Sequence, residues 1–152
     1  TKAMPKISVE LRSKFESEQQ KAMLNTMFTA NWLRGKAVER FRSFGLSPEQ
    51  YNILRILRGG KGKMKMHDVR DRMIDRAPNT TRLTDKLVIK GLVHRERCES
   101  VRRVVFVNIT KSGLALLEEI DLAMKAEARS DQEKLSNKEA SMLNGILDKW
   151  RG

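Results

Sequence analysis

The strongest constraint on the fold lies between residues 66 and 109, where two short helix-forming stretches are followed directly by two β-rich runs. Apolar residues recur at helical spacing in both stretches, at positions 66, 69, 73 and 74 and then at 83, 87 and 88. Pro78 suits the first turn of the second helix, and Gly91 suits the position just past its end. The runs 92–96 and 103–109 flank a polar segment, so they predict a β-hairpin with a basic tip.

Longer helices are predicted on both sides of this segment. From residue 8 to about residue 42 the chain has no proline and carries apolar residues at helical spacing, which predicts one long amphipathic helix. Ser47 is placed to cap a following helix, and Thr110 and Ser136 are placed to cap two more. The predicted fold is therefore mainly α with a small β-hairpin, in a single domain over residues 1–152.

Charge is distributed unevenly along the chain. Lys and Arg contribute 31 positive charges against 19 negative charges, a formal net charge of +12. The net charge is +6 over residues 1–60 (11 − 5), +8 over 61–113 (14 − 6) and −2 over 114–152 (6 − 8). A localised excess of this kind favours a polyanion as partner. The chain has few aromatic residues to spare for stacking on single strands, which favours double-stranded nucleic acid.

Several functional classes are disfavoured. No stretch approaches the roughly 20 consecutive apolar residues of a membrane-spanning helix, so we expect a soluble, cytoplasmic protein with no membrane partner. Cys98 is the only cysteine, which excludes an internal disulfide. With His67 and His94 as the only histidines, neither a metal site nor a cofactor is expected. An enzyme is not expected, because neither histidine has a motif-spaced carboxylate or hydroxyl partner.

Two short helices followed by a basic hairpin predict a winged helix-turn-helix, in which the second helix enters the major groove of DNA. Its first two turns offer side chains to base edges, where Arg suits guanine, Asn suits adenine and a Thr methyl suits thymine. The candidate DNA-binding residues there are Asn79, Thr80, Thr81, Arg82, Asp85 and Lys86. In the hairpin, Arg102 and Arg103 are adjacent on an extended strand, so their side chains point to opposite faces and one of them is expected to reach DNA.

Three ordered motifs resemble the multiple-antibiotic-resistance regulator (MarR) family. The first is LSPEQYNIL at 46–54, the second is NTTRLTDKL at 79–87 running into KGLV at 90–93, and the third is RRV at 102–104 before ITKSG at 109–113. The resemblance covers roughly residues 20–125 in order. Each motif is weak alone, whereas their ordered combination is fairly specific.

The resemblance implies a homodimeric transcription factor, often a repressor, whose partner is duplex DNA, here an inverted-repeat operator. It implies dimerisation helices over 1–45 and 114–152 around a winged helix-turn-helix over 46–113. By the same resemblance Thr80, Thr81 and Arg82 lie in the major groove, and Arg102 or Arg103 lies at the wing. The chain departs from the family pattern at 98–101 (CESV), where the aspartate that usually buttresses a wing arginine is missing.

In many members of that family a small phenolic or other aromatic ligand binds between the dimerisation and DNA-binding parts and weakens DNA binding. Phe28, Trp32 and Tyr51 are the candidate effector-binding residues, although such side chains at helical spacing also serve cores and dimer interfaces. Cys98 is either a redox switch or an incidental thiol. The lysines at positions 61, 63 and 65 suit phosphate contacts or a solvated loop.

Two other functions remain open. A net charge of +12 drives salt-sensitive attachment to any duplex, so the alternative is a non-specific chromosomal or RNA-associated protein. Sequence preference at physiological salt separates this alternative from a regulator. A module that uses its long helices to bind other proteins would be a monomer that ignores DNA.

Overall fold

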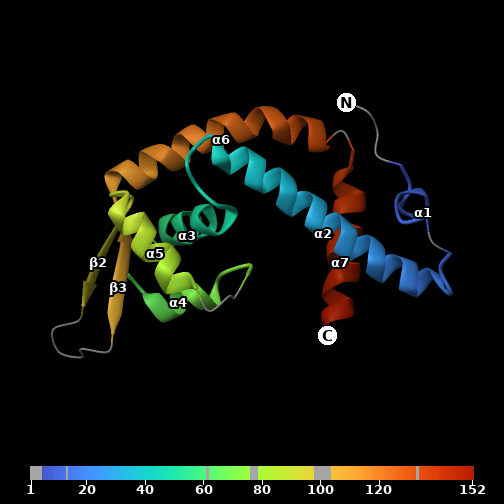
Figure 1. The fold of residues 1–152 in the computed structure, drawn as a ribbon, viewed down its shortest axis with the longest axis horizontal. Helices are drawn as coiled ribbons and strands as arrows, with labels where there is room; N and C mark the ends of the chain where they lie inside the picture. Colours follow the sequence, from blue (N-terminus) through green and yellow to red (C-terminus); the bar gives the residue numbers. More distant parts are fainter. Residues whose placement is uncertain (1–4, 13, 61, 76–78, 98–103, 133) are drawn as a thin grey trace. The chain divides into compact units, whose positions relative to one another are not determined.

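The computed structural model describes residues 5–12, 14–60, 62–75, 79–97, 104–132 and 134–152, with the backbone alone over 126–132. The chain forms two compact units, Thr1–Pro48 and Glu49–Gly152. The elements, all but β1 labelled in Figure 1, are α1 (Ile7–Glu10), α2 (Glu18–Arg42), α3 (Pro48–Gly59), β1 (Met64–Lys65), α4 (Met66–Asp71), α5 (Thr80–Ile89), β2 (Val93–Arg97), β3 (Val105–Ile109), α6 (Lys111–Gln132) and α7 (Asn137–Arg151).

The N-terminal unit contains two helices where one was predicted. The single helix from residue 8 to 42 is wrong, because the backbone of Arg12 adopts a left-handed φ of 47° after α1. A new helix then begins behind Ser17, whose side-chain oxygen accepts a hydrogen bond from the backbone N–H of Gln20 at 3.1 Å. Helix α2 ends before a glycine in a left-handed conformation, since Gly45 has a φ of 67° and the Leu46 N–H donates to the carbonyl of Phe41 at 3.0 Å.

Helices α3 and α6 supply part of the core of the C-terminal unit. The helix α3 begins at Pro48, as the sequence predicts, and buries Ile53, Leu54 and Leu57. Helix α6 contributes Leu117 and Ile120, which are fully buried. Burial of these aliphatic side chains stabilises the unit by about 1.5–3 kcal/mol for each one. The short helices and strands between α3 and α6 in the sequence pack around these buried side chains.

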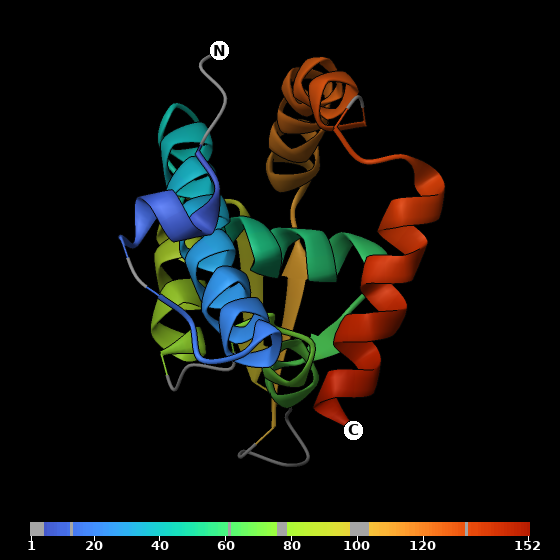
Figure 2. The same cartoon turned by 90° about the vertical axis from the view of Figure 1, so that its right-hand side faces the viewer.

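A three-stranded antiparallel sheet replaces the simple hairpin of the sequence prediction. The predicted hairpin is confirmed as β2 and β3, paired in a register that sets Val93 opposite Ile109. The additional strand β1 pairs with the other edge of β3, with Met64 opposite Val107, so the strand order is β1-β3-β2. A two-residue strand is too short to produce an alternating pattern in the sequence. Figure 2 shows β3 leading directly into α6.

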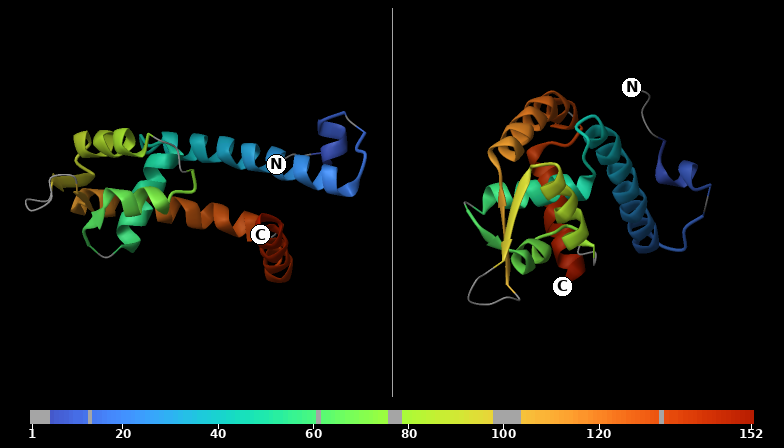
Figure 3. Two further views of the ribbon diagram at one scale, coloured as in Figure 1. Left: turned by 90° about the horizontal axis from the view of Figure 1, so that it is seen from below. Right: turned by 60° about the vertical axis from the view of Figure 1, so that its left-hand side comes forward.

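The two short helices predicted before the hairpin are both present. Helix α4 ends at Asp71, earlier than predicted, which leaves Ile74 outside it and 83% exposed. Helix α5 ends at the predicted glycine: Gly91 has a φ of 70°, and the Leu92 N–H donates to the Leu87 carbonyl at 3.0 Å. This turn leads directly into β2, and α5 packs beside that strand (Figure 3).

The last two helices begin at the predicted caps. The Thr110 hydroxyl accepts from the Gly113 N–H at 3.1 Å, at the start of α6. Ser136 and Glu139 form a reciprocal capping box at the start of α7. Hydrogen bonds from the Ser136 hydroxyl and backbone N–H lower the pKa of the Glu139 carboxyl below its usual value. Over the described residues, no helix combines the length and apolar character needed to cross a membrane.

Candidate nucleic-acid interface

One face of α5 presents polar and basic side chains to solvent. Asn79, Thr81, Arg82 and Lys86 are exposed, as the sequence analysis expects for residues that meet DNA. Arg82 and Lys86 are one helical turn apart, so they lie on the same side of the helix. Within the described part of the chain, neither side chain takes part in an ion pair. Both donor groups therefore remain available for bases or phosphates.

Thr80 does not belong to this exposed face. It is 2% exposed, and its backbone carbonyl accepts a hydrogen bond from the Thr84 hydroxyl at 2.9 Å. The cause is helical periodicity, because positions 80, 84 and 87 form one stripe and Leu87 is fully buried. The expectation that the Thr80 side chain enters the groove differs from its position in the structure. The spacing of positions 80, 84 and 87 is apparent in the sequence. Because threonine has a polar hydroxyl, Thr80 was nevertheless predicted to be exposed.

The surroundings of Asp85 also differ from those expected of a residue that contacts DNA. Its carboxylate accepts a hydrogen bond from the guanidinium of Arg95, an ion pair that joins α5 to β2. The Arg95 side chain is 29% exposed and that of Asp85 47% exposed, so water screens the pair only in part. This carboxylate therefore has a partner within the protein, which the sequence analysis did not expect. Arg95 was not predicted from the sequence, because no local pattern indicates that it pairs with Asp85, ten residues earlier.

A second ion pair tethers the opposite face of β2. The carboxylate of Glu96 accepts from the ammonium of Lys63, which precedes β1. Lys63 therefore has a partner within the protein, whereas the side chain of Lys65 is exposed. Lys61, also named as a candidate for phosphate contact, lies outside the described residues. Of the two lysines that the structure describes, Lys65 fits a phosphate contact better.

The tip of the hairpin lies outside the described residues, which stop at Arg97 and resume at Val104. The expected roles of Arg102 and Arg103 at the wing, and of Cys98 as a thiol, therefore stay predictions. What the structure supplies is the base of the hairpin, where β2 and β3 are paired along their whole length.

His67 has a neighbour that the sequence analysis overlooked. His67 Nε2 lies 3.0 Å from an oxygen of Asp71, four residues on. Its Nδ1 lies 2.9 Å from a guanidinium nitrogen of Arg70. All three side chains are on the exposed surface of α4. In the stretches that the structure describes, no three His, Cys, Asp or Glu side chains gather to hold a metal ion.

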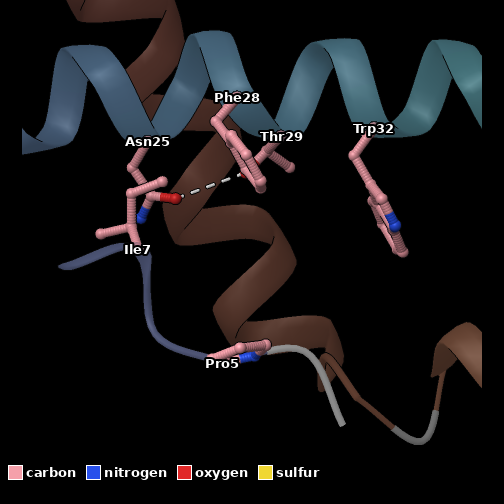
Figure 4. Close-up of a pocket in the computed structure, with 6 residues that line it drawn as sticks. All are labelled: Pro5, Ile7, Asn25, Phe28, Thr29 and Trp32. Atoms are coloured by element: carbon pink, nitrogen blue, oxygen red, sulfur yellow. Dashed lines mark hydrogen bonds between the residues drawn. The ribbon is translucent and has the colours of Figure 1, made fainter. Parts of the chain in front are cut away.

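The candidate effector residues divide between the two units. Phe28 and Trp32 extend from α2 into a cavity of about 230 Å³ that Pro5 and Ile7 also line, as Figure 4 shows. Lys36 Nζ lies 4.4 Å from the centroid of the Trp32 ring. Tyr51 is in the C-terminal unit, where its hydroxyl lies 3.7 Å from the Met124 sulfur. The structure thus brings two of the three predicted residues together.

Comparison with known proteins agrees with this arrangement. The MarR family model matches residues 44–104. The HTH-type transcriptional regulator MhqR of Bacillus subtilis (strain 168) is 31% identical over 103 residues, which are 68% of this chain and 70% of that protein. The crystal structure of a MarR transcription factor from Planctomyces limnophilus is 34% identical, with a TM-score of 0.68, and the match covers 89% of this chain and 98% of that one.

A third similar structure is a mutant MarR from E. coli complexed with operator DNA, with 21% identity and a TM-score of 0.73 over 90% of this chain and 98% of that one. At that identity the likeness concerns the fold. The predicted winged helix-turn-helix is confirmed by these fold neighbours together with α4, α5 and the β2–β3 hairpin. Because the Planctomyces limnophilus MarR transcription factor is above 30% identity over most of both chains, and MhqR is above 30% over two thirds of both, this chain belongs to the MarR family of DNA-binding transcriptional regulators.

Proposed function

We propose that this regulator is a homodimer that reads an inverted-repeat operator in double-stranded DNA and represses transcription from it. The observation that carries the proposal is the exposed face of α5, where Asn79, Thr81, Arg82 and Lys86 are presented together. Arg can form two hydrogen bonds with guanine and Asn two with adenine in the major groove. Such a face suits sequence reading better than charge attraction alone.

The distribution of charge supports duplex DNA as the partner. The segment 61–113, which contains α4, α5 and the hairpin, holds the largest positive excess of the chain, +8. Phosphate attraction of this kind supplies affinity without sequence preference, and base contacts supply the preference. The E. coli MarR with a similar fold is complexed with operator DNA, which is consistent with this assignment. A DNA partner also implies a location with the chromosome, and we propose the cytoplasm.

Apolar surface on the terminal helices supports a homodimer. No described residue of α7 is buried, although Met142, Leu143, Ile146 and Trp150 recur along it at helical spacing. Helix α2 likewise exposes Met23, Met27 and Leu33. A second copy that covers such stripes would remove them from water. We therefore assign 1–45 and 114–152 to dimerisation and 46–113 to DNA binding, within one functional domain.

A small aromatic ligand is the proposed signal that releases the operator. The support is the cavity beside Phe28 and Trp32, whose lining is largely apolar and whose size suits a single small ring system. Tyr51 does not line this cavity and stays a candidate from the sequence alone. The repressor role and the ligand both follow from the family resemblance.

Selection from a pool of randomised duplex DNA at about 0.15 M salt tests the proposal. An enriched inverted repeat, with half-sites about 10 base pairs apart, is the expected result for a two-fold symmetric reader. Tight binding that collapses as salt rises, with no enriched sequence, would replace the proposal by the non-specific chromosomal alternative. Recovery of single half-sites only would argue against the dimer.

A further inference from the structure

We propose that Asp85 and Arg95 are positioning residues, which hold the β2–β3 hairpin against α5 so that both DNA-facing elements are presented at one fixed spacing. The inference rests on the proposed function, because it assigns a role within DNA reading. It differs from the sequence expectation, in which Asp85 itself meets a base. It also gives Arg95 a role that the sequence motifs do not assign.

The geometry places the pair where it can set this spacing. Asp85 is on the flank of α5, between the exposed side that carries Arg82 and the buried side that carries Leu87. Arg95 shares its face of β2 with the buried Val93, because strand side chains alternate. The guanidinium therefore reaches α5 from the core side of the sheet. Its partial burial makes the ion pair stronger and less sensitive to salt than a fully exposed one.

A second tether acts on the next residue of the same strand. Glu96 points to the opposite face of β2 and pairs with Lys63. Two consecutive residues thus anchor both faces of β2, one to α5 and one to the segment before β1. The side chains of Lys63 and Glu96 are 57% and 38% exposed, so this second pair is the weaker of the two. The anchors lie near the end of β2 that leads to the hairpin tip.

Charge makes the role of Asp85 testable. A carboxylate beside Arg82 and Lys86 repels phosphates, so its removal alone should strengthen attachment to any duplex. A positioning residue behaves differently, because its removal disturbs the fit to the operator. The two effects act in opposite directions on specific and on non-specific DNA.

The experiment compares Asp85→Asn with Asp68→Asn in the full chain, on an enriched operator and on a scrambled duplex. Asp68 is an exposed carboxylate in the first turn of α4, and its change alters the charge equally. We expect Asp85→Asn to lose about fivefold or more in operator affinity while its affinity for the scrambled duplex stays equal or rises. Asp68→Asn should bind both duplexes equally well or more tightly. Tighter operator binding by both variants would overturn the proposal.

A double-mutant cycle with Arg95→Gln assigns the effect to the pair. Once Arg95 is changed, Asp85→Asn should cost little further operator affinity, because the partner is already absent. Additive losses would show that the two residues act separately and would overturn the proposal. If Asp85→Asn fails to fold, Arg95→Lys keeps the charge but loses the fork geometry, and the same loss of operator preference is expected.

Amide hydrogen exchange tests the tether without DNA. In Asp85→Asn the paired amides of β2 and β3 should exchange several times faster, while those of α3 and α6 keep their rates. Unchanged exchange in the hairpin would overturn the positioning role. The two proposals can fail separately. If the wild-type protein shows no operator preference, the proposed function is contradicted, whereas faster hairpin exchange in Asp85→Asn would still support the ion pair as the tether.

Discussion

A Cβ atom on Gly113 would stand 2.4 Å from the carbonyl oxygen of Leu92 and 2.7 Å from Cγ1 of Ile109. The start of α6 is therefore packed so closely against the entry of β2 and the end of β3 that only glycine fits. The Thr110 N–H, just before α6, donates to the same Leu92 carbonyl at 3.1 Å. This contact joins the DNA-binding segment to the helix that continues toward the C-terminus.

Gly113→Ala should lower the free energy of unfolding by about 1–3 kcal/mol, because the added methyl group must displace backbone as well as a side chain. Chemical denaturation measures the change. Gly59→Ala is the matched control, since a Cβ at that position at the end of α3 meets nothing within 4 Å. The control should be neutral or gain about 0.5 kcal/mol. Equal effects of the two changes would contradict the close packing at Gly113.

The helix α7 should lose its N-terminal cap in acid. The pKa of Glu139 is lowered in the folded state, so its contribution is fully present above the unfolded value of 4.5 and is lost as the pH falls through the folded pKa. Circular dichroism from pH 6 to pH 3 should show helix loss in the wild type. Glu139→Gln, which cannot ionise, should remove this part of the titration. An identical titration in that variant would argue against the capping box.

A charge on the apolar stripe of α7 should dissociate the dimer. Ile146 is 55% exposed on the side of α7 that also carries Met142 and Trp150. Ile146→Asp should shift sedimentation toward the monomer and weaken operator binding, since a carboxylate in an apolar interface is costly. Asn144→Asp adds the same charge on the other side of the helix and should leave the dimer intact. Dissociation by both variants would show that the apolar stripe of α7 is not specifically the dimer interface.

Small aromatic compounds should quench the fluorescence of Trp32. The ring lines the cavity of the N-terminal unit, next to Phe28, so a ligand bound there contacts the fluorophore. A Trp150→Phe background isolates the signal, because the chain has two tryptophans. Phe28→Ala should weaken quenching by removing apolar contact. Quenching that persists unchanged in this variant would place the ligand elsewhere.

Local signals in the sequence predicted most of the element boundaries. Gly45 and Gly91 end helices because each adopts a left-handed backbone, and Thr110 and Ser136 begin helices because their hydroxyls accept a backbone N–H. Each of these effects involves residues at most a few positions apart. The break before α2 was missed, since the cap at Ser17 stands within a run that is otherwise helical in pattern.

The candidate site was predicted only where exposure follows from local pattern. Arg82 and Lys86 are on the expected face, but the ion pair of Asp85 with Arg95 depends on how a helix packs on a strand. Thr80 was misplaced because its hydroxyl suggests an exposed side chain, whereas its stripe belongs to the core. The strand β1 depends on a partner more than 40 residues away, which no short window of sequence contains.

The most direct test of sequence reading by α5 is the affinity of Arg82→Ala for the operator and for every single-base variant of it. If Arg82 contacts a base, the variant loses about 1–3 kcal/mol and no longer discriminates at one base position, while preferences at the other positions persist. Lys65→Ala, with the same loss of charge, should weaken binding to all sequences alike and reduce the salt slope by about one. An equal loss on every sequence for Arg82→Ala would contradict base reading and leave the protein a duplex binder without sequence preference.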